Sequence, residues 1–392
     1  MHVLESIACH DNLKIDLPEI YQKYYPLDKS KYITIDISEG AKKEKYNYWK
    51  IVLDMVYDFL ISNEVTIYQI GENKEEHLNS TTSLIGGLDL SQKAYVMRNS
   101  LLHIGLNNIS SHIASFLGTK TLSLFGSEFV DQAKPYWSNN SNFQGICPES
   151  EFLPSQLLES NEINKVKPET IAGKIITALG GHFEKQFDSV EIGRFFLNRK
   201  VESSMSSVVP NIKQFGIPSL ICRMDYEFNE KALATQLGLC PCSIVTSKPI
   251  DLRILKLYRK NVLEILYVID EESDPAFVSG VNKLGIKIGV STYLSQEKLN
   301  PIKMKYMDFP QNITLLNIEK IKKVNLEQKE RYFYKSNKFI LHDGKMFASK
   351  SAMKRNQFCE NFNPPFFPVY DEDDFWVDAE YYYLVEKNQL TY

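Results

Sequence analysis

Five polar residues that could bind a phosphate group lie close together in the first third of the chain. They are Asn107, Asn108, Ser110, Ser111 and His112. The apolar run 101–104 precedes them and Gly105 ends it, which predicts a buried strand before a polar turn. Asparagine and serine often begin helices, and Ile113, Phe116 and Leu117 follow at the apolar spacing of a helix. A polar loop between a strand and a helix N-terminus favours binding of a phosphorylated ligand.

The polar stretch resembles the donor-site motif of glycosyltransferase family nine, the lipopolysaccharide heptosyltransferases. Matching positions are His112, Ala114, Leu117, Gly118, Leu124, Phe125 and Gly126. Two positions depart from the family pattern. Asn107 stands where the family has an aspartate, which removes a charge, and Ile109 stands where it has a glycine. Together with the residue types, the resemblance implies a donor site made by Asn107, Asn108, Ser110, Ser111, His112 and Gly126.

An earlier stretch is similar to another segment of that family. Tyr32–Ile37 predicts a strand, and Gly40, Ala41, Lys45 and Trp49 follow it in the family's places. A glycine turn and a lysine before a helix can hold phosphate, and in the family the lysine contacts the donor phosphate. Gly40 and Lys45 are therefore expected to bind the donor. The alternative is a solvated lysine cluster at a helix start.

Glu72 follows the next predicted strand, Val65–Ile70. In the family a Gly-Gly turn lies here, near the nucleoside of the donor, and only Gly71 and Glu72 remain of that pattern. The resemblance implies that Glu72 contacts the ribose or the base. The alternative is an exposed carboxylate in a turn.

Candidates for a general base lie in the second half of the chain. Glycosyl transfer needs a group that takes the proton of the acceptor hydroxyl. After the apolar run Pro218–Cys222 come Arg223, Asp225 and Glu227, ahead of a predicted helix. Asp225 is the first candidate and Glu227 the second, unless Asp225 caps the helix or pairs with Arg223. Lys248, in the turn after the next strand, could contact the acceptor or a phosphate, as Arg223 could.

The resemblance implies an inverting enzyme that needs neither a metal nor a cofactor. A metal-free site stabilises a leaving diphosphate with lysine, hydroxyl groups and helix N-terminal amides. No Asp-x-Asp pair stands at a predicted strand end in the first half of the chain. Asp371, Asp373 and Asp374 near the C-terminus could bind a cation, and the alternative is a solvated acidic run.

Alternating strands and helices must position these residues. From 32 to 126 the alternation predicts a doubly wound parallel sheet. We predict three domains, which are a Rossmann-like donor domain at 1–184, a second α/β domain on the acceptor side at 185–330, and a C-terminal hairpin with an acidic aromatic tail at 331–392. Strands of the second domain are expected at 217–223, 243–246, 264–269 and 287–290. Asp343-Gly344 is typical of a hairpin turn.

Two Rossmann-like halves that face one cleft form the GT-B fold of glycosyltransferases, and this is the predicted α/β fold class. In that fold the acceptor half usually comes first, whereas here the donor-like half does. The chain is then either a permuted GT-B enzyme or a donor half joined to an unrelated α/β domain. The resemblance covers about residues 31–180, and 185–392 resemble no family.

Composition narrows the class of protein. With 392 residues, 43% apolar and 24% charged, the chain is expected to be globular with more than one domain. A net charge of −4 excludes a wholly basic nucleic-acid coat. No apolar run reaches the roughly 18 residues of a spanning helix, and the N-terminus lacks a signal-peptide pattern. The cysteines are scattered apart from Cys240 and Cys242, which predicts reduced thiols in a cytoplasm or, for that pair, a redox or partial metal site.

The leading interpretation is a transferase that moves a sugar from a nucleotide-sugar donor to a glycan or other hydroxyl acceptor. Three alternatives remain. A basic stretch with interleaved aromatic residues could steer a polyanion, which would suit a phosphorylated glycan as acceptor or DNA whose bases are glycosylated, unless the stretch is a solvated hairpin face. It comprises Lys335, Lys338, Lys345, Lys350, Lys354 and Arg355, with Phe339 and Phe347. The changes at Asn107 and Ile109 would fit a non-catalytic binding or assembly protein. A sugar-nucleotide isomerase or epimerase of GT-B type is a further alternative.

Overall fold

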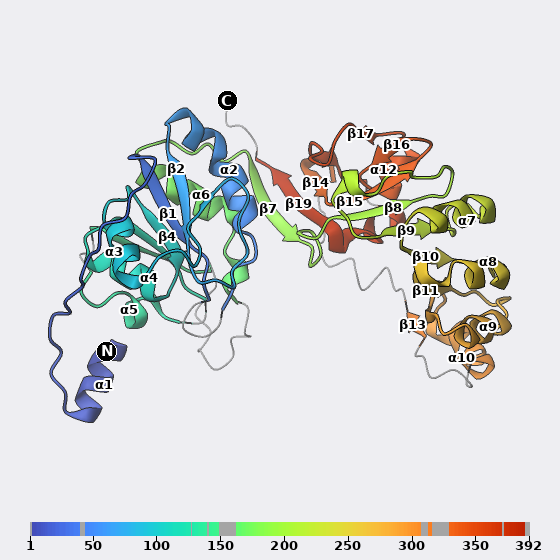
Figure 1. Cartoon of the computed structure of the whole chain (residues 1–392), viewed down its shortest axis with the longest axis horizontal. Coiled ribbons are helices and arrows are strands. Elements are labelled where there is room, and N and C mark those ends of the chain that lie inside the picture. Colours follow the sequence, from blue (N-terminus) through green and yellow to red (C-terminus); the bar gives the residue numbers. More distant parts are fainter. Residues whose placement is uncertain are drawn as a thin grey trace. The chain divides into compact units, whose positions relative to one another are not determined.

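The chain forms two compact units, residues 1–186 and 187–392 (Figure 1). The computed structural model describes residues 2–39, 44–126, 128–138, 141–148, 162–306, 313–315, 329–370 and 372–388. Among these residues, no helix combines the length and the apolar character that crossing a bilayer requires.

Unit 1 contains a six-stranded parallel sheet in the order β3-β2-β1-β4-β5-β6. Its strands are β1 (Tyr32–Asp36), β2 (Thr66–Ile70), β3 (Thr82–Ser83), β4 (His103–Leu106), β5 (Thr121–Leu124) and β6 (Phe143–Ile146). Its helices are α1 (Val3–Asp11), α2 (Trp49–Ser62), α3 (Leu90–Arg98), α4 (Ile109–Phe116), α5 (Val130–Ala133) and α6 (Pro168–Ala178). This strand order is that of a Rossmann fold, and it reverses between β1 and β4.

Helices cover both faces of this sheet, as the sequence predicts. Ile33 and Ile35 of β1 point to one face, where they share a core with α2 and α6. Tyr32 of β1 and Ile70 of β2 lie in a second core with α3 and α4. Figure 1 shows the two helix pairs on opposite sides of the strands. In a doubly wound sheet the loops on either side of this reversal leave in opposite directions, and such sheets bind ligands there.

The strand before the polar stretch lies two residues later than predicted. β4 spans 103–106 and continues through Gly105, which was expected to end it. A side chain at Gly105 would place its Cβ 2.9 Å from the carbonyl oxygen of Asp36 in β1. Glycine is therefore used here for the close approach of two strands rather than for a turn.

The helix that follows begins in the polar turn, as predicted. The side chain of Asn108 accepts a hydrogen bond from the Ser111 amide at 3.1 Å and caps α4. Gly118, with φ +82°, follows the end of that helix. Residues 84–88 form a turn after the short β3, and β6 follows later in the chain at 143–146. β6 is an edge strand that pairs with β5. Hydrogen bonds to β5 stabilise its extended conformation, and the apolar pattern of its own residues is too weak to predict a strand.

Unit 2 contains a nine-stranded sheet in the order β13-β12-β11-β10-β9-β8-β15-β16-β17 and a four-stranded antiparallel sheet in the order β18-β14-β19-β7. In chain order the strands are β7 (Phe187–Ile192), β8 (Lys200–Ser203), β9 (Leu220–Arg223), β10 (Cys242–Thr246), β11 (Val262–Val268), β12 (Lys287–Thr292), β13 (Thr314–Leu315), β14 (Tyr332–Ser336), β15 (Lys338–His342), β16 (Lys345–Phe347), β17 (Phe358–Cys359), β18 (Phe367–Pro368) and β19 (Tyr382–Lys387). The helices are α7 (Glu230–Leu239), α8 (Leu252–Leu257), α9 (Ala276–Lys283), α10 (Gln296–Lys305), α12 (Lys350–Lys354) and α13 (Asp373–Trp376).

The parallel part of the large sheet is wound in one direction. Its strands follow one another in space from β8 to β13, so right-handed crossovers place α7 to α10 on one face. Buried residues of those helices share one core with strand residues such as Cys222 and Ile244. The predicted hairpin is present, with Asp343 at φ 47° and Gly344 at φ 73°. Its first strand, β15, pairs with β8, so the C-terminal region is part of this sheet.

Candidate functional site

A buried acid lies at the carboxyl end of β1, next to the end of β4. Asp36, the last residue of β1, is only 2% exposed. Its Oδ1 accepts a hydrogen bond from the amide of Ser38 at 2.9 Å, and its Oδ2 accepts one from the hydroxyl of Ser110 at 2.5 Å. Asp36 therefore ties the end of β1 to the first turn of α4.

A second carboxylate lies beside Asp36. The hydroxyl of Ser38 lies between Oδ1 of Asp36 and Oε1 of Glu75, 2.5 Å from the latter, and the amide of Glu72 donates to the same Oε1 at 2.8 Å. Oε2 of Glu75 is buried and has no partner among the described residues. Burial raises the pKa of Glu75, and the nearby Asp36 carboxylate adds to the rise. This edge of the sheet thus offers an acid that is more easily protonated than an exposed one.

Sequence reasoning did not identify Asp36, Ser38 or Glu75. The available signal was the polar pair Asp36 and Ser38 directly after an apolar strand, the place where parallel sheets position functional groups. The strand was instead extended through 37 as part of the sheet. Glu75 gives no such signal, because it reaches the site by turning back from a loop.

His112 lies at the same edge, in a chain of hydrogen bonds with two other residues. Its Nε2 is 3.0 Å from Oδ1 of Asn107, and Nδ2 of Asn107 donates to Oε2 of Glu128 at 2.7 Å. Burial lowers the pKa of His112, and the nearby ring of His2 lowers it further. The ring is therefore neutral near pH 7. Glu128, in the loop after β5, was not identified from the sequence.

The other predicted donor residues on α4 are largely engaged within the protein. The hydroxyl of Ser111 donates to the carbonyl of Leu106 at 2.7 Å, and that of Ser110 is bound to Asp36. Asn108 caps the helix. The amides of Ile109 and Ser110, at the start of the helix, have no intrahelical partner and remain available to an anion. Ile109 is 67% exposed and does not adopt a positive φ, so its backbone does not require the glycine of the family motif.

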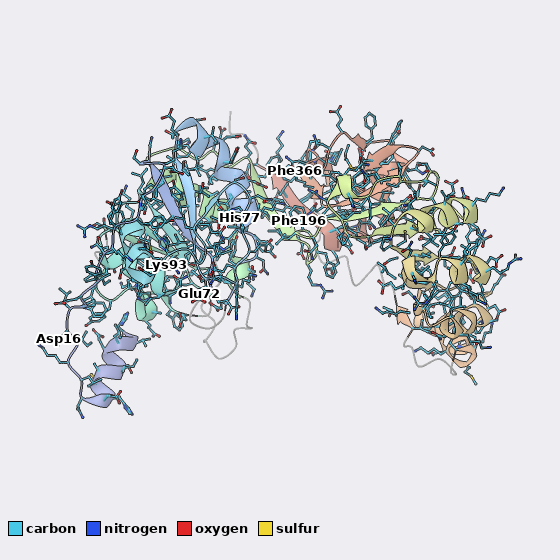
Figure 2. All side chains as sticks on the ribbon, in the orientation of Figure 1. Asp16, Glu72, His77, Lys93, Phe196 and Phe366 are labelled. Carbon is cyan, nitrogen blue, oxygen red and sulfur yellow. The ribbon has the colours of Figure 1, made fainter. Side chains whose placement is uncertain are left out.

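Three of the donor residues predicted outside α4 are described, and these lie around the same sheet. Lys45 is exposed, and its carbonyl accepts a hydrogen bond from Asn164 at 3.0 Å. Gly40 lies outside the described residues. Glu72, labelled in Figure 2, is exposed after β2. The lack of a side chain at Gly126 leaves room for the carboxylate of the buried Glu44. A Cβ added at this position would lie 2.5 Å from Oε1 of Glu44.

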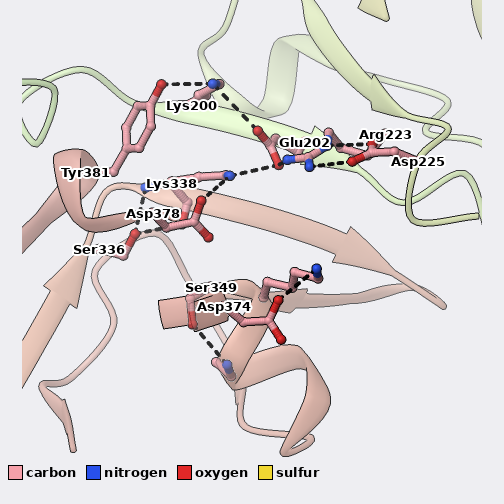
Figure 3. Close-up of polar contacts among 12 residues, drawn as sticks. Lys200, Glu202, Arg223, Asp225, Ser336, Lys338, Ser349, Asp374, Asp378 and Tyr381 are labelled. Carbon is pink, nitrogen blue, oxygen red and sulfur yellow. Dashed lines mark hydrogen bonds and ion pairs between the residues drawn. The ribbon is translucent and has the colours of Figure 1, made fainter. Parts of the chain in front are cut away.

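Unit 2 contains a network of buried charges (Figure 3). Nζ of Lys338 lies 3.0 Å from Oε2 of Glu202 and 2.6 Å from Oδ1 of Asp378. Glu202 also accepts a hydrogen bond from Nη1 of Arg223 at 2.7 Å. Despite its burial, the three cations Lys338, Arg223 and Lys200 hold the pKa of Glu202 at about 2. The network joins β8, β9 and β15 to the C-terminal segment.

Asp225, the first candidate for the base, is bound by Arg223. Both of its carboxylate oxygens accept hydrogen bonds from that guanidinium, at 2.8 and 2.7 Å. This is the ion pair that the sequence left open as the alternative. Glu227 is exposed, as is Lys248, whose Nζ lies 5.8 Å from the ring centroid of Phe228. The amide of Asp225 bonds to Val245 of β10 at 3.2 Å, so these two turns lie side by side.

The basic stretch near the C-terminus does not form a free basic face. Lys338 is buried in the network, Lys350 and Lys354 pair with Asp374, and Arg355 pairs with Glu372. The interleaved aromatic residues, Phe339 and Phe347, belong to the core. Four of its six cations are thus paired with carboxylates within the unit, which argues against a surface that steers a polyanion.

Asp371 lies outside the described residues, and Asp373 is exposed. Asp374 is held by two lysines.

All six cysteines are free thiols. The sulfur atoms of Cys240 and Cys242 are 3.8 Å apart in the core of unit 2. Burial raises the pKa of Cys240 to about 11, and a hydrogen bond with Cys222 together with burial raises that of Cys242. A protonated thiol is a poor nucleophile and metal ligand, so the structure favours a packing role for this pair.

No protein-family model matches the chain, and no curated protein matches it significantly. Among solved structures, the chain is similar to ADP-heptose lps heptosyltransferase II of E. coli, with 13% identity over 45% of this chain and 50% of that one and a TM-score of 0.30. It is also similar to the dodecameric iron-containing heptosyltransferase TibC in complex with ADP-D-beta-D-heptose, with 13% identity over 40% and 47% and a TM-score of 0.31. A structure of TibC from enterotoxigenic E. coli H10407, titled as a glycosyltransferase, gives 12% identity over 41% and 47% and a TM-score of 0.32. The chain spans about half the length of these structures.

Proposed function

We propose that unit 1 binds a nucleotide sugar at the carboxyl ends of β1 and β4 and that the chain is a glycosyltransferase. The observation that carries this proposal is the reversal of strand order between β1 and β4, with the free amides at the start of α4 beside it. Open α/β sheets bind ligands at such a point, and helix N-terminal amides bind phosphate. The motif resemblance around His112 adds the sugar-nucleotide class.

The proposed site divides the ligand between two kinds of group. The amides of Ile109 and Ser110, with Lys45, would hold the diphosphate as it leaves. Asp36 and Glu75 lie beside them, and carboxylates suit hydroxyl groups rather than phosphate. We therefore assign Glu75, whose Oε2 has no partner among the described residues, to the ribose or sugar hydroxyls, while the buried Asp36 holds Ser38 and Ser110 in place. Inversion of configuration and independence of metal are parts of the same proposal, and turnover is expected to survive excess chelator.

For the acceptor side we propose the turns after β9 and β10 in unit 2. Glu227 is the stronger candidate for the base, since Asp225 is bound on both oxygens by Arg223. Lys248 is exposed in the neighbouring turn and could hold an anionic acceptor. A glycan or another hydroxyl compound is the proposed acceptor.

A non-catalytic binding protein is the second candidate, because the first predicted base is engaged in an ion pair. Isothermal titration with UDP-, ADP-, GDP- and CMP-sugars tests the shared requirement for donor binding. Binding of one sugar nucleotide with slow hydrolysis or transfer would support the enzyme. Binding without any turnover would support the second candidate, and absence of binding across the panel would overturn both.

A further inference from the structure

The orientation of the Asn107 amide is decided by Glu128. An ionised carboxylate only accepts hydrogen bonds, so the group that faces Glu128 at 2.7 Å must be the NH₂ of Asn107. The carbonyl Oδ1 of Asn107 then faces Nε2 of His112 at 3.0 Å. Asn107 is only 7% exposed, which leaves the amide little freedom to turn over.

This orientation also decides where His112 carries its proton. Since Oδ1 of Asn107 only accepts, Nε2 of His112 must be the donor, and in a neutral ring Nδ1 is then an acceptor. Among the described residues, none forms a hydrogen bond with Nδ1. An acceptor nitrogen cannot bond an ionised phosphate oxygen, which also only accepts, but it can bond a hydroxyl group.

We propose that Glu128 is a positioning residue that acts through Asn107 to hold His112 in the Nε2–H form, so that Nδ1 receives a hydrogen bond from a hydroxyl of the sugar nucleotide. The proposal builds on the proposed function, which places the ligand at this edge of the sheet. It assigns His112 to the hydroxyl-bearing part of the ligand and leaves the diphosphate to the helix amides and Lys45.

The neutral residue at 107 is what makes the arrangement compatible with Glu128. An aspartate at 107 would set two carboxylates against each other at hydrogen-bond distance, and like charges so close destabilise both ionised forms. In the double variant Asn107→Asp with Glu128→Gln, the new carboxylate at 107 would accept the hydrogen bond from Nε2 of His112. The new side-chain amide at 128 would donate a hydrogen bond to that carboxylate. Asn107→Asp alone is therefore predicted to disrupt these hydrogen bonds, whereas Asn107→Asp with Glu128→Gln is predicted to preserve them.

The first test reads the tautomer of His112 without any ligand. Nitrogen-15 NMR of the full chain, labelled at histidine, distinguishes Nε2–H from Nδ1–H, and His112→Gln identifies the signal. We expect Nε2–H in the wild type and in Glu128→Gln, whose Oε1 can still accept, and a mixture in Glu128→Leu. Glu184→Leu, an exposed glutamate of the same unit, serves as the matched control. An unchanged tautomer in folded Glu128→Leu would overturn the proposal.

The second test measures binding. His112→Ala should weaken the best nucleotide sugar by about threefold to tenfold, the loss of one hydrogen bond, and leave inorganic diphosphate affinity unchanged. Asn107→Asp should weaken the nucleotide sugar, and Asn107→Asp with Glu128→Gln should recover most of the loss. Equal losses for diphosphate and nucleotide sugar in His112→Ala would overturn the hydroxyl assignment. If no nucleotide sugar binds the wild type, the proposed function fails, while the NMR result still decides whether Glu128 sets the tautomer.

Discussion

Arg223 holds both carboxylate oxygens of Asp225 with one side of its guanidinium, while its Nη1 reaches the buried Glu202 at 2.7 Å. The arginine thus connects the buried charges of unit 2 to the carboxyl end of β9. A carboxylate bound on both oxygens has little capacity left for an incoming proton. Glu227, two residues later, is exposed and is not held in this way.

We expect Glu227→Gln to lower turnover by about 10²–10⁴-fold, as removal of a general base does. Asp225→Asn should act mainly on stability, with a loss of about 1–3 kcal/mol in the free energy of unfolding because Arg223 would lose a charged partner. Donor affinity, measured by titration, should stay constant in both variants, since the proposed donor site lies in unit 1. If Asp225→Asn abolishes turnover with unchanged stability, Asp225 is the base.

The buried network predicts a large effect at Lys338. Replacing it by methionine would leave Glu202 and Asp378 facing each other without their shared cation, and breaking a buried ion pair costs about 3–5 kcal/mol. Lys298→Met is the matched control, because the Lys298–Glu271 pair is exposed and should contribute little. Equilibrium urea unfolding of the two variants checks the difference. Similar midpoints for Lys338→Met and Lys298→Met would show that the network does not stabilise unit 2.

Local signals sufficed for much of the fold. The helix start at Asn108 and the Asp343-Gly344 turn each depend on neighbours in the sequence, and each is found as predicted. The strands β1, β2 and β10 also follow from short apolar runs. These features are readable because the residues that cause them are adjacent in the chain.

The parts that sequence reasoning missed depend on distant partners. Lys338 and Glu202 are separated by most of unit 2 in the chain, and nothing near either residue shows that the other neutralises it. The same holds for Glu128, whose role appears only when the loop after β5 meets the end of β4. Lys338 was therefore interpreted as a surface cation, and Glu128 was not considered.

His103 predicts a loss of stability in acid. It is fully buried in β4, its Nδ1 lies 3.0 Å from the hydroxyl of Thr34, and its Nε2 has no partner among the described residues. Burial lowers its pKa from 6.5 to about 4. Between these values the unfolded chain binds the proton and the folded chain does not, so stability falls as the pH drops from about 6.5 to about 4. The full difference is on the order of 3 kcal/mol.

The measurement is urea unfolding at pH 7, 6 and 5, followed by pulsed hydrogen exchange of peptides from β1 and β4. His103→Gln should flatten the pH dependence of unit 1. His10→Gln, at an exposed histidine on α1, should leave that dependence unchanged. Equal slopes for wild type and His103→Gln would show that another group causes the acid sensitivity.

Lys45 is predicted to contact the diphosphate of the donor. It lies in the connection from β1 to α2, on the carboxyl side of the sheet, where its carbonyl is fixed by Asn164 at 3.0 Å while its side chain is exposed. No ion pair is found for it within the described part of the chain. Lys45→Ala should weaken nucleoside diphosphate by about 1–3 kcal/mol, as for a hydrogen bond to a charged group, and leave free nucleoside affinity nearly unchanged. Lys50→Ala, an exposed lysine on the following helix, is the control and should affect neither ligand. Equal losses for nucleoside and nucleoside diphosphate in Lys45→Ala would place this lysine away from the phosphates and leave the α4 amides as the remaining phosphate-binding groups of the proposed site.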